Sequence, residues 1–456
     1  MSAWKLSAVE LLDAYRSRTL SPVEAMRSTL ERNEAVNPLI NALFEVRGEA
    51  AMDQARASEA RWSKGEPAGP LDGIPVTIKD SVAAEGWKYW RGTKARIGTV
   101  SDHDAPPTAR LKDAGAIIFG KSTMPDFGLL ASGVSSAHGV TRNPWDRSKN
   151  TGGSSSGAAA AVAAGVGSLT IGSDLGGSIR LPAAQCGLFG HKPTTGLVPH
   201  TPVSSLRVAG PLTRTVADAA LLLSVVSRPD VRTSEPGGPT TSSVSPLSPE
   251  GLRLGLLLDM GYGPKVEDEV AQIVEDAARL IAAQGASLSN IAPPIDFDVS
   301  RDFDRLFSVR AAMERDELAP EKRVETIDFI GRYCDFGDAV SAKDYLQSAT
   351  NMEKAKAQYA AGLSAYDFVL APVLPMAGFD ADVTGPNLDR PTVHVNFTAM
   401  VNQVGWPAAS ICCGFTRSGL PVGLQIIAAK GRDEAILGLA AYFETLRGFD
   451  YRFPDI

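Results

Sequence analysis

Apolar residues recur along this chain in two alternating patterns, short continuous runs and positions three or four residues apart. Short runs are typical of buried strands, whereas the wider spacing is typical of helices. The expected strands cover 40–46, 73–79, 117–119, 252–258, 410–413 and 420–427. The expected helices lie within 6–35, 47–64, 105–116, 157–165, 218–226, 266–283, 300–360 and 433–446. Strands that alternate with helices predict an α/β chain.

Cap and breaker residues mark the ends of one early helix. Ser21 followed by Pro22 predicts a helix start, because serine caps the first N–H groups and proline needs no partner there. Asn37 followed by Pro38 predicts its end. The segment 157–165 is almost all alanine, so this helix must be packed tightly against its neighbours.

Composition narrows the class of protein. With 456 residues, 44% hydrophobic and 21% charged, the chain is typical of a globular protein with a large core. A net charge of −7 predicts no direct nucleic-acid partner. Four cysteines without framework spacing indicate a reducing compartment, so we expect a cytoplasmic protein. No run approaches the roughly 20 apolar residues of a membrane span, so we expect no membrane association.

Two clusters of glycine and serine are the candidate site. The first is Gly-Gly-Ser-Ser-Ser-Gly at 152–157, and the second is Asp-Leu-Gly-Gly-Ser-Ile-Arg at 174–180. Ser178 in the second cluster follows Ser154 in the first by 24 residues. Glycines beside a serine let the backbone approach a ligand closely, so the pair suggests a nucleophile site.

A serine nucleophile needs a base, and Lys79 is the candidate. None of the five histidines stands in a nucleophile-elbow sequence. Lys79 ends the apolar run that begins at Gly73, and burial there would lower its pKa and leave it neutral. Taken alone, the position is more typical of a lysine at a strand end that reaches out to solvent.

Five ordered motifs resemble the amidase signature family of Ser-cis-Ser-Lys amide hydrolases. They are the two glycine-serine clusters together with Gly-Ile-Pro-Val-Thr-Ile-Lys-Asp at 73–80, Gly-Lys-Ser-Thr-Met-Pro-Asp-Phe at 120–127 and Thr-Arg-Asn-Pro-Trp-Asp at 141–146. Later segments, 366–373 and 397–408, resemble the family's late strand and the helix that follows it. The resemblance is strongest over 70–215. It implies one amidase domain over 1–456, with a central mixed β-sheet covered by helices on both faces.

The resemblance also implies a role for each catalytic residue. Ser178 matches the acylated nucleophile, Ser154 matches the bridging serine that carries a cis peptide bond, and Lys79 matches the general base. Backbone N–H groups around Leu175, Gly176, Gly177 and Ser178 would form the oxyanion hole, and a substrate-contacting backbone group would lie near Gly128. Arg180 would support the loop. The family needs no metal and no cofactor, and no zinc-like spacing of Cys and His is present.

Other residues have less certain roles. The aromatic stretch from Trp87 to Trp90 replaces a smaller turn of the family, so it is either a wall of the acyl pocket or packing. Ser156 adds a hydroxyl where the family more often has glycine, and His191 is expected to be structural. Arg310, Arg332 and Tyr333 are candidates to meet a substrate carboxylate or to face solvent.

The expected function is hydrolysis of a small-molecule amide by acyl transfer to Ser178. One alternative is the glutaminase component of a tRNA-dependent amidotransferase, its A subunit, which would pass ammonia to a partner. A second is an inactive scaffold protein, against which the intact lysine and serines argue. Residues 228–250, rich in proline, serine and threonine, predict a flexible linker within the domain. The resemblance also allows a homodimer, for which the sequence has no signal.

Overall fold

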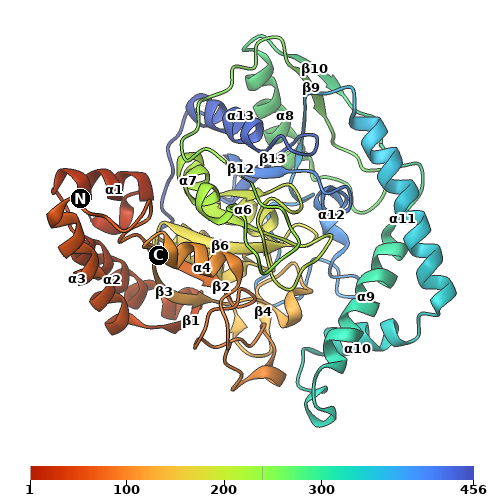
Figure 1. The fold of residues 1–456 in the computed structure, drawn as a ribbon. Helices are drawn as coiled ribbons and strands as arrows, with labels where there is room; N and C mark the ends of the chain where they lie inside the picture. The colour runs from red at the N-terminus through yellow and green to blue at the C-terminus, as the bar shows by residue number, and fades with distance from the viewer. Residues whose placement is uncertain (1, 239) are drawn as a thin grey trace.

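One mixed sheet organises the computed structural model, which describes residues 2–238 and 240–456 (Figure 1). Within those residues the sheet has 11 strands in the order β1-β3-β2-β6-β8-β7-β12-β13-β11-β9-β10. Its strands are β1 (Leu43–Val46), β2 (Pro75–Lys79), β3 (Ile117–Ser122), β6 (Leu169–Asp174), β7 (Phe189–Lys192), β8 (Val208–Thr213), β9 (Arg253–Leu256), β10 (Ser287–Asn290), β11 (Phe368–Pro372), β12 (Ala408–Phe415) and β13 (Pro421–Ile427). A separate small ribbon pairs β4 (Val134–Ser135) with β5 (Gly139–Val140).

The sheet combines two parallel parts with an antiparallel centre. β2 runs parallel to β3 and β6, and β9 runs parallel to β10 and β11. The strands between them, from β8 to β13, pair antiparallel. The expected α/β fold with a mixed central sheet is therefore confirmed.

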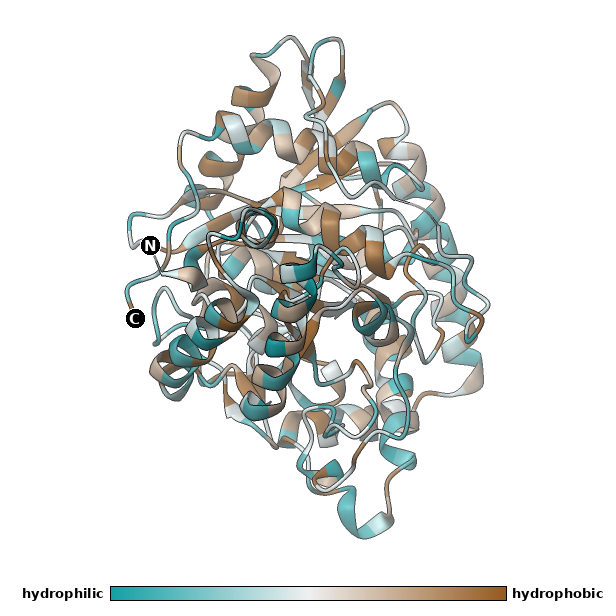
Figure 2. Cartoon of the chain, turned by 60° about the vertical axis from the view of Figure 1, so that its left-hand side comes forward, coloured by the Kyte–Doolittle hydropathy of each residue, from teal (hydrophilic) through white to brown (hydrophobic). Residues whose placement is uncertain are grey.

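Helices cover both faces of the sheet. They are α1 (Ala8–Ser17), α2 (Pro22–Ile40), α3 (Gly48–Lys64), α4 (Pro106–Asp113), α5 (Ser156–Ala163), α6 (Arg180–Gln185), α7 (Val216–Val226), α8 (Asp268–Ala282), α9 (Ser300–Asp316), α10 (Asp328–Asp338), α11 (Ala342–Leu363), α12 (Asn396–Gln403) and α13 (Asp433–Leu446). α7, α8 and α13 pack on one face, and α5, α6 and α12 pack on the other. Hydrophobic residues gather on the strands between these layers (Figure 2). α9, α10 and α11 form a group at one side of the molecule (Figure 1).

The alanine-rich helix is buried along its whole length, as expected. Every residue of α5 is buried. A Cβ at Gly157 would lie 2.2 Å from the carbonyl oxygen of Ala42 and 2.5 Å from the backbone N of Thr123. Only glycine fits such an approach, so small residues bring α5 onto the sheet beside the candidate site.

The end of α2 differs from the prediction. The helix continues through Pro38 to Ile40, and β1 begins at Leu43 rather than at Ile40. Asn41 adopts a left-handed conformation (φ 52°) that ends the helix. The Asn37 side chain accepts the N–H groups of Ala42 (2.8 Å) and Leu43. These contacts stabilise the turn after Ile40 and outweigh the local preference of the residue before proline.

The chain after the proline- and serine-rich stretch completes the same sheet. Residues 228–250 hold no helix or strand in their described part, and residue 239 lies outside it. β9 follows at once and pairs with β11. The expected helices of 300–360 are present as α9, α10 and α11.

Candidate active site

Lys79 lies at the end of β2 with its side chain buried and its ammonium inside the molecule. Only 1% of the residue is exposed. Its Nζ lies 2.8 Å from Ser154 Oγ and 3.2 Å from Ser173 Oγ. The alternative of a lysine that reaches out to solvent is therefore wrong.

The surroundings of Lys79 favour its neutral form. Burial lowers the pKa of Lys79 to about 7 because the charged form loses its hydration. The carboxylate of Asp174 opposes this shift, and the guanidinium groups of Arg207 and Arg91 add to it. Near neutral pH a large fraction of Lys79 is thus able to accept a proton.

Ser154 follows a cis peptide bond, between Gly153 and Ser154, and is buried. A Cβ at Gly153 would lie 2.4 Å from the carbonyl oxygen of Ser132. Gly128 lies on the other side of Ser154, since a Cβ there would be 3.2 Å from Ser154 Oγ. The first glycine-serine cluster therefore packs backbone against backbone around Ser154.

Ser178 occupies the turn between β6 and α6 and is half-buried. Its carbonyl oxygen accepts the N–H of Ser155 (3.2 Å), which joins the two serine clusters directly. Ser178 lines one cavity together with Lys79 and Ser154. The structure thus brings together the three residues that the motifs single out.

The turn before Ser178 contains backbone N–H groups that have no acceptor among the described residues. Within residues 2–238 and 240–456, the N–H groups of Leu175, Gly176 and Ser178 meet no acceptor. The N–H of Gly177 differs from the expectation, because it donates to Asp174 Oδ1 (2.7 Å). Gly177 (φ 130°) shapes the turn, and the other three N–H groups stay available to a bound oxygen.

A buried ion pair supports this turn from behind. Arg180 Nε donates to Asp174 Oδ2 and Nη2 donates to Asp174 Oδ1, both at 3.0 Å. Both side chains are fully buried. Burial alone would raise the pKa of Asp174, but Arg180 holds it well below its usual range. Asp174 stays ionised, and its second contact, with the N–H of Ile179, fixes the start of α6.

Three distant residues complete this support. Arg180 also donates to Asn402 Oδ1 (2.6 Å) and Gln425 Oε1 (2.7 Å). Thr398 Oγ1 donates to the carbonyl oxygen of Gly176 (2.6 Å). Sequence reasoning assigned them no role. The signal for Gln425 is a polar side chain inside an otherwise apolar strand, which needs a buried partner.

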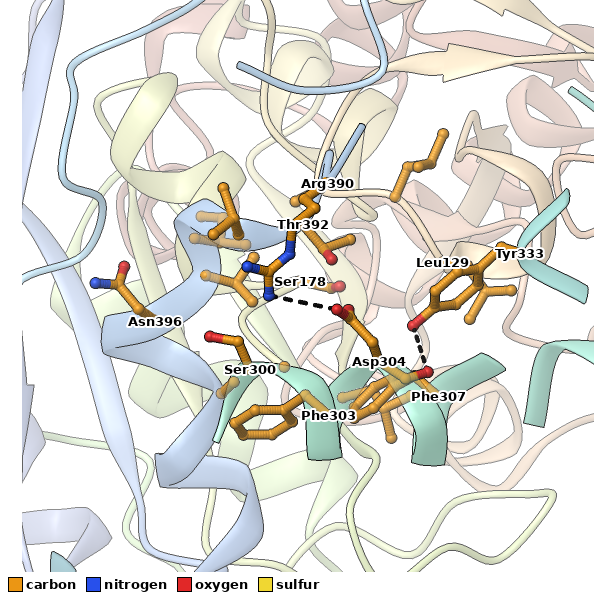
Figure 3. A pocket seen from close by; sticks show the side chains of 18 of the residues that line it. Leu129, Ser178, Ser300, Phe303, Asp304, Phe307, Tyr333, Arg390, Thr392 and Asn396 are labelled. Carbon is orange, nitrogen blue, oxygen red and sulfur yellow. Dashed lines mark hydrogen bonds and ion pairs between the residues drawn. The ribbon is translucent and has the colours of Figure 1, made fainter. Parts of the chain in front are cut away.

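Two cavities meet at Ser178, and they differ in character. The larger, about 90 Å³, is mostly apolar and is shown in Figure 3. Its wall includes Leu129, Leu181, Phe303, Phe307, Tyr333, Val393, Val395, and the ion pair of Asp304 with Arg390. The smaller, about 30 Å³, contains Lys79 and Ser154 together with Arg91, Arg207, Arg310 and Glu314.

The aromatic stretch lies outside both cavities. Trp87 is 6% exposed within the main core, and Arg47 stacks on its ring. The Trp90 ring lies beside Phe44, with 5.3 Å between centroids. Neither tryptophan lines either cavity. Packing, rather than a wall of the acyl pocket, is the role this geometry favours.

The other residues that the sequence singled out lie in different environments. His191 is buried and bonds to Asp433 Oδ1 (3.0 Å), as expected of a structural histidine. Arg332 is on the surface, where it pairs with Asp328. Arg310 and Tyr333 line the smaller and the larger cavity respectively.

Ser156 turns away from the relay. Its Oγ donates to the carbonyl oxygen of Thr123 (3.4 Å), and it forms the first residue of α5. It is fully buried. The extra hydroxyl therefore connects α5 to Thr123, the residue that follows β3.

Comparisons with known proteins agree with this geometry. The family model described as Amidase matches residues 24–437. An acylamidase of Rhodococcus erythropolis is 33% identical, covering 98% of this chain and 97% of its own. The A subunit of the glutamyl-tRNA(Gln) amidotransferase from Symbiobacterium thermophilum is 35% identical, covering 97% and 96%. A bacterial aryl acylamidase structure has a TM-score of 0.89 at 26% identity, covering 97% and 96%.

No helix among the described residues has the length and apolar character that a membrane span requires. The family match covers most of the chain, and relatives of about one-third identity align with it nearly end to end. The chain therefore belongs to the amidase signature family, and it is an amide hydrolase.

Proposed function

We propose that Ser178 is the nucleophile of this hydrolase and that Lys79 is its base, acting through Ser154. The observation that carries the proposal is the contact of 2.8 Å between Lys79 Nζ and Ser154 Oγ in a buried site where the pKa of Lys79 is about 7. A neutral amine at this distance from a hydroxyl can accept its proton. Ser178 shares the cavity with both groups.

The reaction follows as an acyl transfer. Neutral Lys79 takes the proton of Ser154 while Ser154 takes that of Ser178, and Ser178 Oγ attacks the amide carbon. The C–N bond breaks as Ser154 returns a proton to the leaving nitrogen. Water then attacks the acyl-enzyme ester, and the same groups return the proton to Ser178. Side chains and water suffice for every step.

The oxyanion of the tetrahedral intermediate would bind the N–H groups of Leu175, Gly176 and Ser178. Each such donor typically contributes about 3–4 kcal/mol to the stability of the transition state. Gly177 contributes through its conformation, since its own N–H is bonded to Asp174. Gly128 lies beside Ser154 and would face the substrate from the opposite side.

A stand-alone amidase is the form of the activity that we favour. The larger cavity beside Ser178 has an apolar wall, which suits an apolar acyl group. Its charged groups, Asp304 and Arg390, pair with each other at 3.3 Å. The amidotransferase component stays the alternative, because relatives of both kinds are about equally similar to this chain.

The four cysteines are free thiols, which supports the proposal that the protein works in the cytoplasm.

The deciding experiment is an assay of the purified chain alone. Glutamine, aliphatic amides and aryl amides are offered, and the Ser178→Ala variant is the control. Hydrolysis of aliphatic or aryl amides without glutamine turnover is expected. Turnover of glutamine only, or none until a partner is added, would favour the amidotransferase component. Unchanged activity of Ser178→Ala would overturn the nucleophile assignment.

A further inference from the structure

The two cavities at Ser178 are not equivalent, because only one of them contains the proton relay. Lys79 and Ser154 line the smaller cavity and not the larger one. Ser178, Leu175, Gly128 and Leu129 line both. An amide that reaches Ser178 must therefore place one half in each cavity.

The relay decides which half lies where. The leaving nitrogen takes its proton from Ser154, so it must come within hydrogen-bond distance of Ser154 Oγ. This places the amine half in the smaller cavity and the acyl half against the apolar wall of the larger one. The smaller cavity is about 30 Å³ against about 90 Å³, so the amine half is the smaller part.

The charges of the smaller cavity are unbalanced. Arg91 is paired with Glu314 at 2.8 Å. Arg207 and Arg310 have no carboxylate within 4.0 Å in the part of the chain that the structure describes. Two unpaired guanidinium groups thus line the amine side of the site. Cations that face a cavity without a counter-ion favour an anionic occupant.

Arg207 is the more confined of the two. One of its Nη atoms donates to the carbonyl oxygen of Pro202 (2.7 Å), and its Nε is buried without an acceptor. Burial and the nearby charge of Arg91 lower the pKa of Arg207 to about 10, and Arg310 adds to this shift. A buried donor without a partner is costly, and a bound carboxylate would supply the missing acceptor.

From this arrangement, and resting on the proposed function, we infer that the substrate is an N-acylated small amino acid. Its carboxylate binds Arg207 and Arg310 on the amine side, and its apolar acyl group lies along the larger cavity. Attack by Ser178 breaks the C–N bond, Ser154 protonates the leaving nitrogen, and the amino acid is released with its carboxylate unchanged. Water then cleaves the ester on Ser178 and releases the acyl group as a carboxylate. The planar guanidinium fork matches a carboxylate better than a neutral group.

The test compares N-phenylacetylglycine with N-isobutylphenylacetamide, which share the acyl group and differ in the charge of the amine half. Release of phenylacetate is measured for both. The acid is expected to have a kcat/KM higher by about 10- to 100-fold, the usual value of a hydrogen bond to a charged group. Equal values, or a preference for a carboxylate on the acyl half, as in N-isobutylsuccinamic acid, would overturn the inference.

Variants of Arg310 show whether the cation binds substrate. Arg310→Met should lower the preference for the acid, mainly through KM, and Arg310→Lys should keep part of it. Arg332→Met is the matched control, since Arg332 is 68% exposed and paired with Asp328 on α10. Suppose Arg310→Met instead shifts the pH dependence of kcat/KM for both substrates and leaves the ratio of their kcat/KM values unchanged. Then Arg310 acts on Lys79 and the inference is wrong.

A binding measurement separates this inference from the proposed function. The Ser178→Ala chain is titrated with each compound by calorimetry, which requires no turnover. Tighter binding of the acid than of the neutral amide, together with weaker binding of the acid when Arg310→Met is added, supports the cation site. This holds even if the wild type cleaves neither compound, in which case only the proposed function is wrong. Equal binding of both compounds overturns the inference even where amides are hydrolysed.

Discussion

The turn that carries Ser178 and the wall across the larger cavity are both held by an ion pair, but in opposite environments. Arg180 and Asp174, beneath the turn, are fully buried. Arg390 and Asp304, in the wall, are 44% and 29% exposed (Figure 3). A buried pair leaves an uncompensated charge when one partner is lost, whereas an exposed pair loses little. The turn with the proposed nucleophile therefore depends strongly on its ion pair, whereas the wall of the larger cavity depends little on its own.

The largest expected effect belongs to Lys79, at the fixed side of this comparison. Lys79→Ala should lower kcat/KM by about 10²–10⁴-fold, which is the usual contribution of general-base catalysis. Steady-state kinetics on an amide that the wild type cleaves measures the change, and circular dichroism checks the fold. A loss of less than about tenfold would leave Lys79 without a role as base.

Arg180→Met tests the support of the turn directly. Its loss leaves Asp174 buried without a counter-charge, which should lower the free energy of unfolding by about 3–5 kcal/mol. Urea unfolding of the variant and the wild type gives the value. The matched control is Arg332→Met, an exposed arginine on α10, which should change stability by less than about 0.5 kcal/mol. Similar losses of unfolding free energy for the two variants would show that burial of the Arg180–Asp174 pair does not contribute to stability.

The pH dependence of kcat/KM should reflect Lys79. Because the pKa of Lys79 is about 7 and only the neutral amine accepts a proton, activity should fall about tenfold per pH unit below 7 and level off above it. A profile on a substrate that does not titrate in this range measures the midpoint. A curve that is flat between pH 5 and about 8 would contradict a neutral lysine base.

Arg390→Ala gives the smallest effect and completes the comparison. The pair with Asp304 is partly exposed, so its loss should change the free energy of unfolding by at most about 1 kcal/mol. Its effect on KM should differ among amides with different acyl groups, since Arg390 lines the larger cavity. Equal changes in KM for all of them would remove Arg390 from the substrate-facing wall.

The sequence predicted the three residues that meet at the candidate site, because they lie in short motifs with unusual composition. The two glycine-serine clusters and the apolar run that ends at Lys79 are visible in the sequence itself. The supporting residues could not be predicted in this way. Asn402 on α12 and Gln425 on β13 follow Arg180 by 222 and 245 positions, and only the tertiary fold brings them to it.

Two local predictions show the same limit. Pro38 was expected to end α2, but the side chain of Asn37 ties down the residues beyond Ile40. The stretch from Trp87 to Trp90 has the composition of a pocket wall, yet tertiary packing places Trp87 in the core. At Pro38 a side-chain contact 5 or 6 residues along the chain outweighs the local preference, and at Trp87 contacts made elsewhere in the fold do so.

The close fit of α5 has a consequence for anyone who wishes to redirect this enzyme to a new amide. Even a methyl group at Gly157 would clash with the backbone at Ala42 and Thr123. Larger residues at this position of the helix are therefore expected to disrupt the fold. Mutant libraries belong instead on α9 and on residues 390–395, which line the larger cavity. Screens built there would vary the acyl group accepted while every member keeps Ser178, the proposed nucleophile.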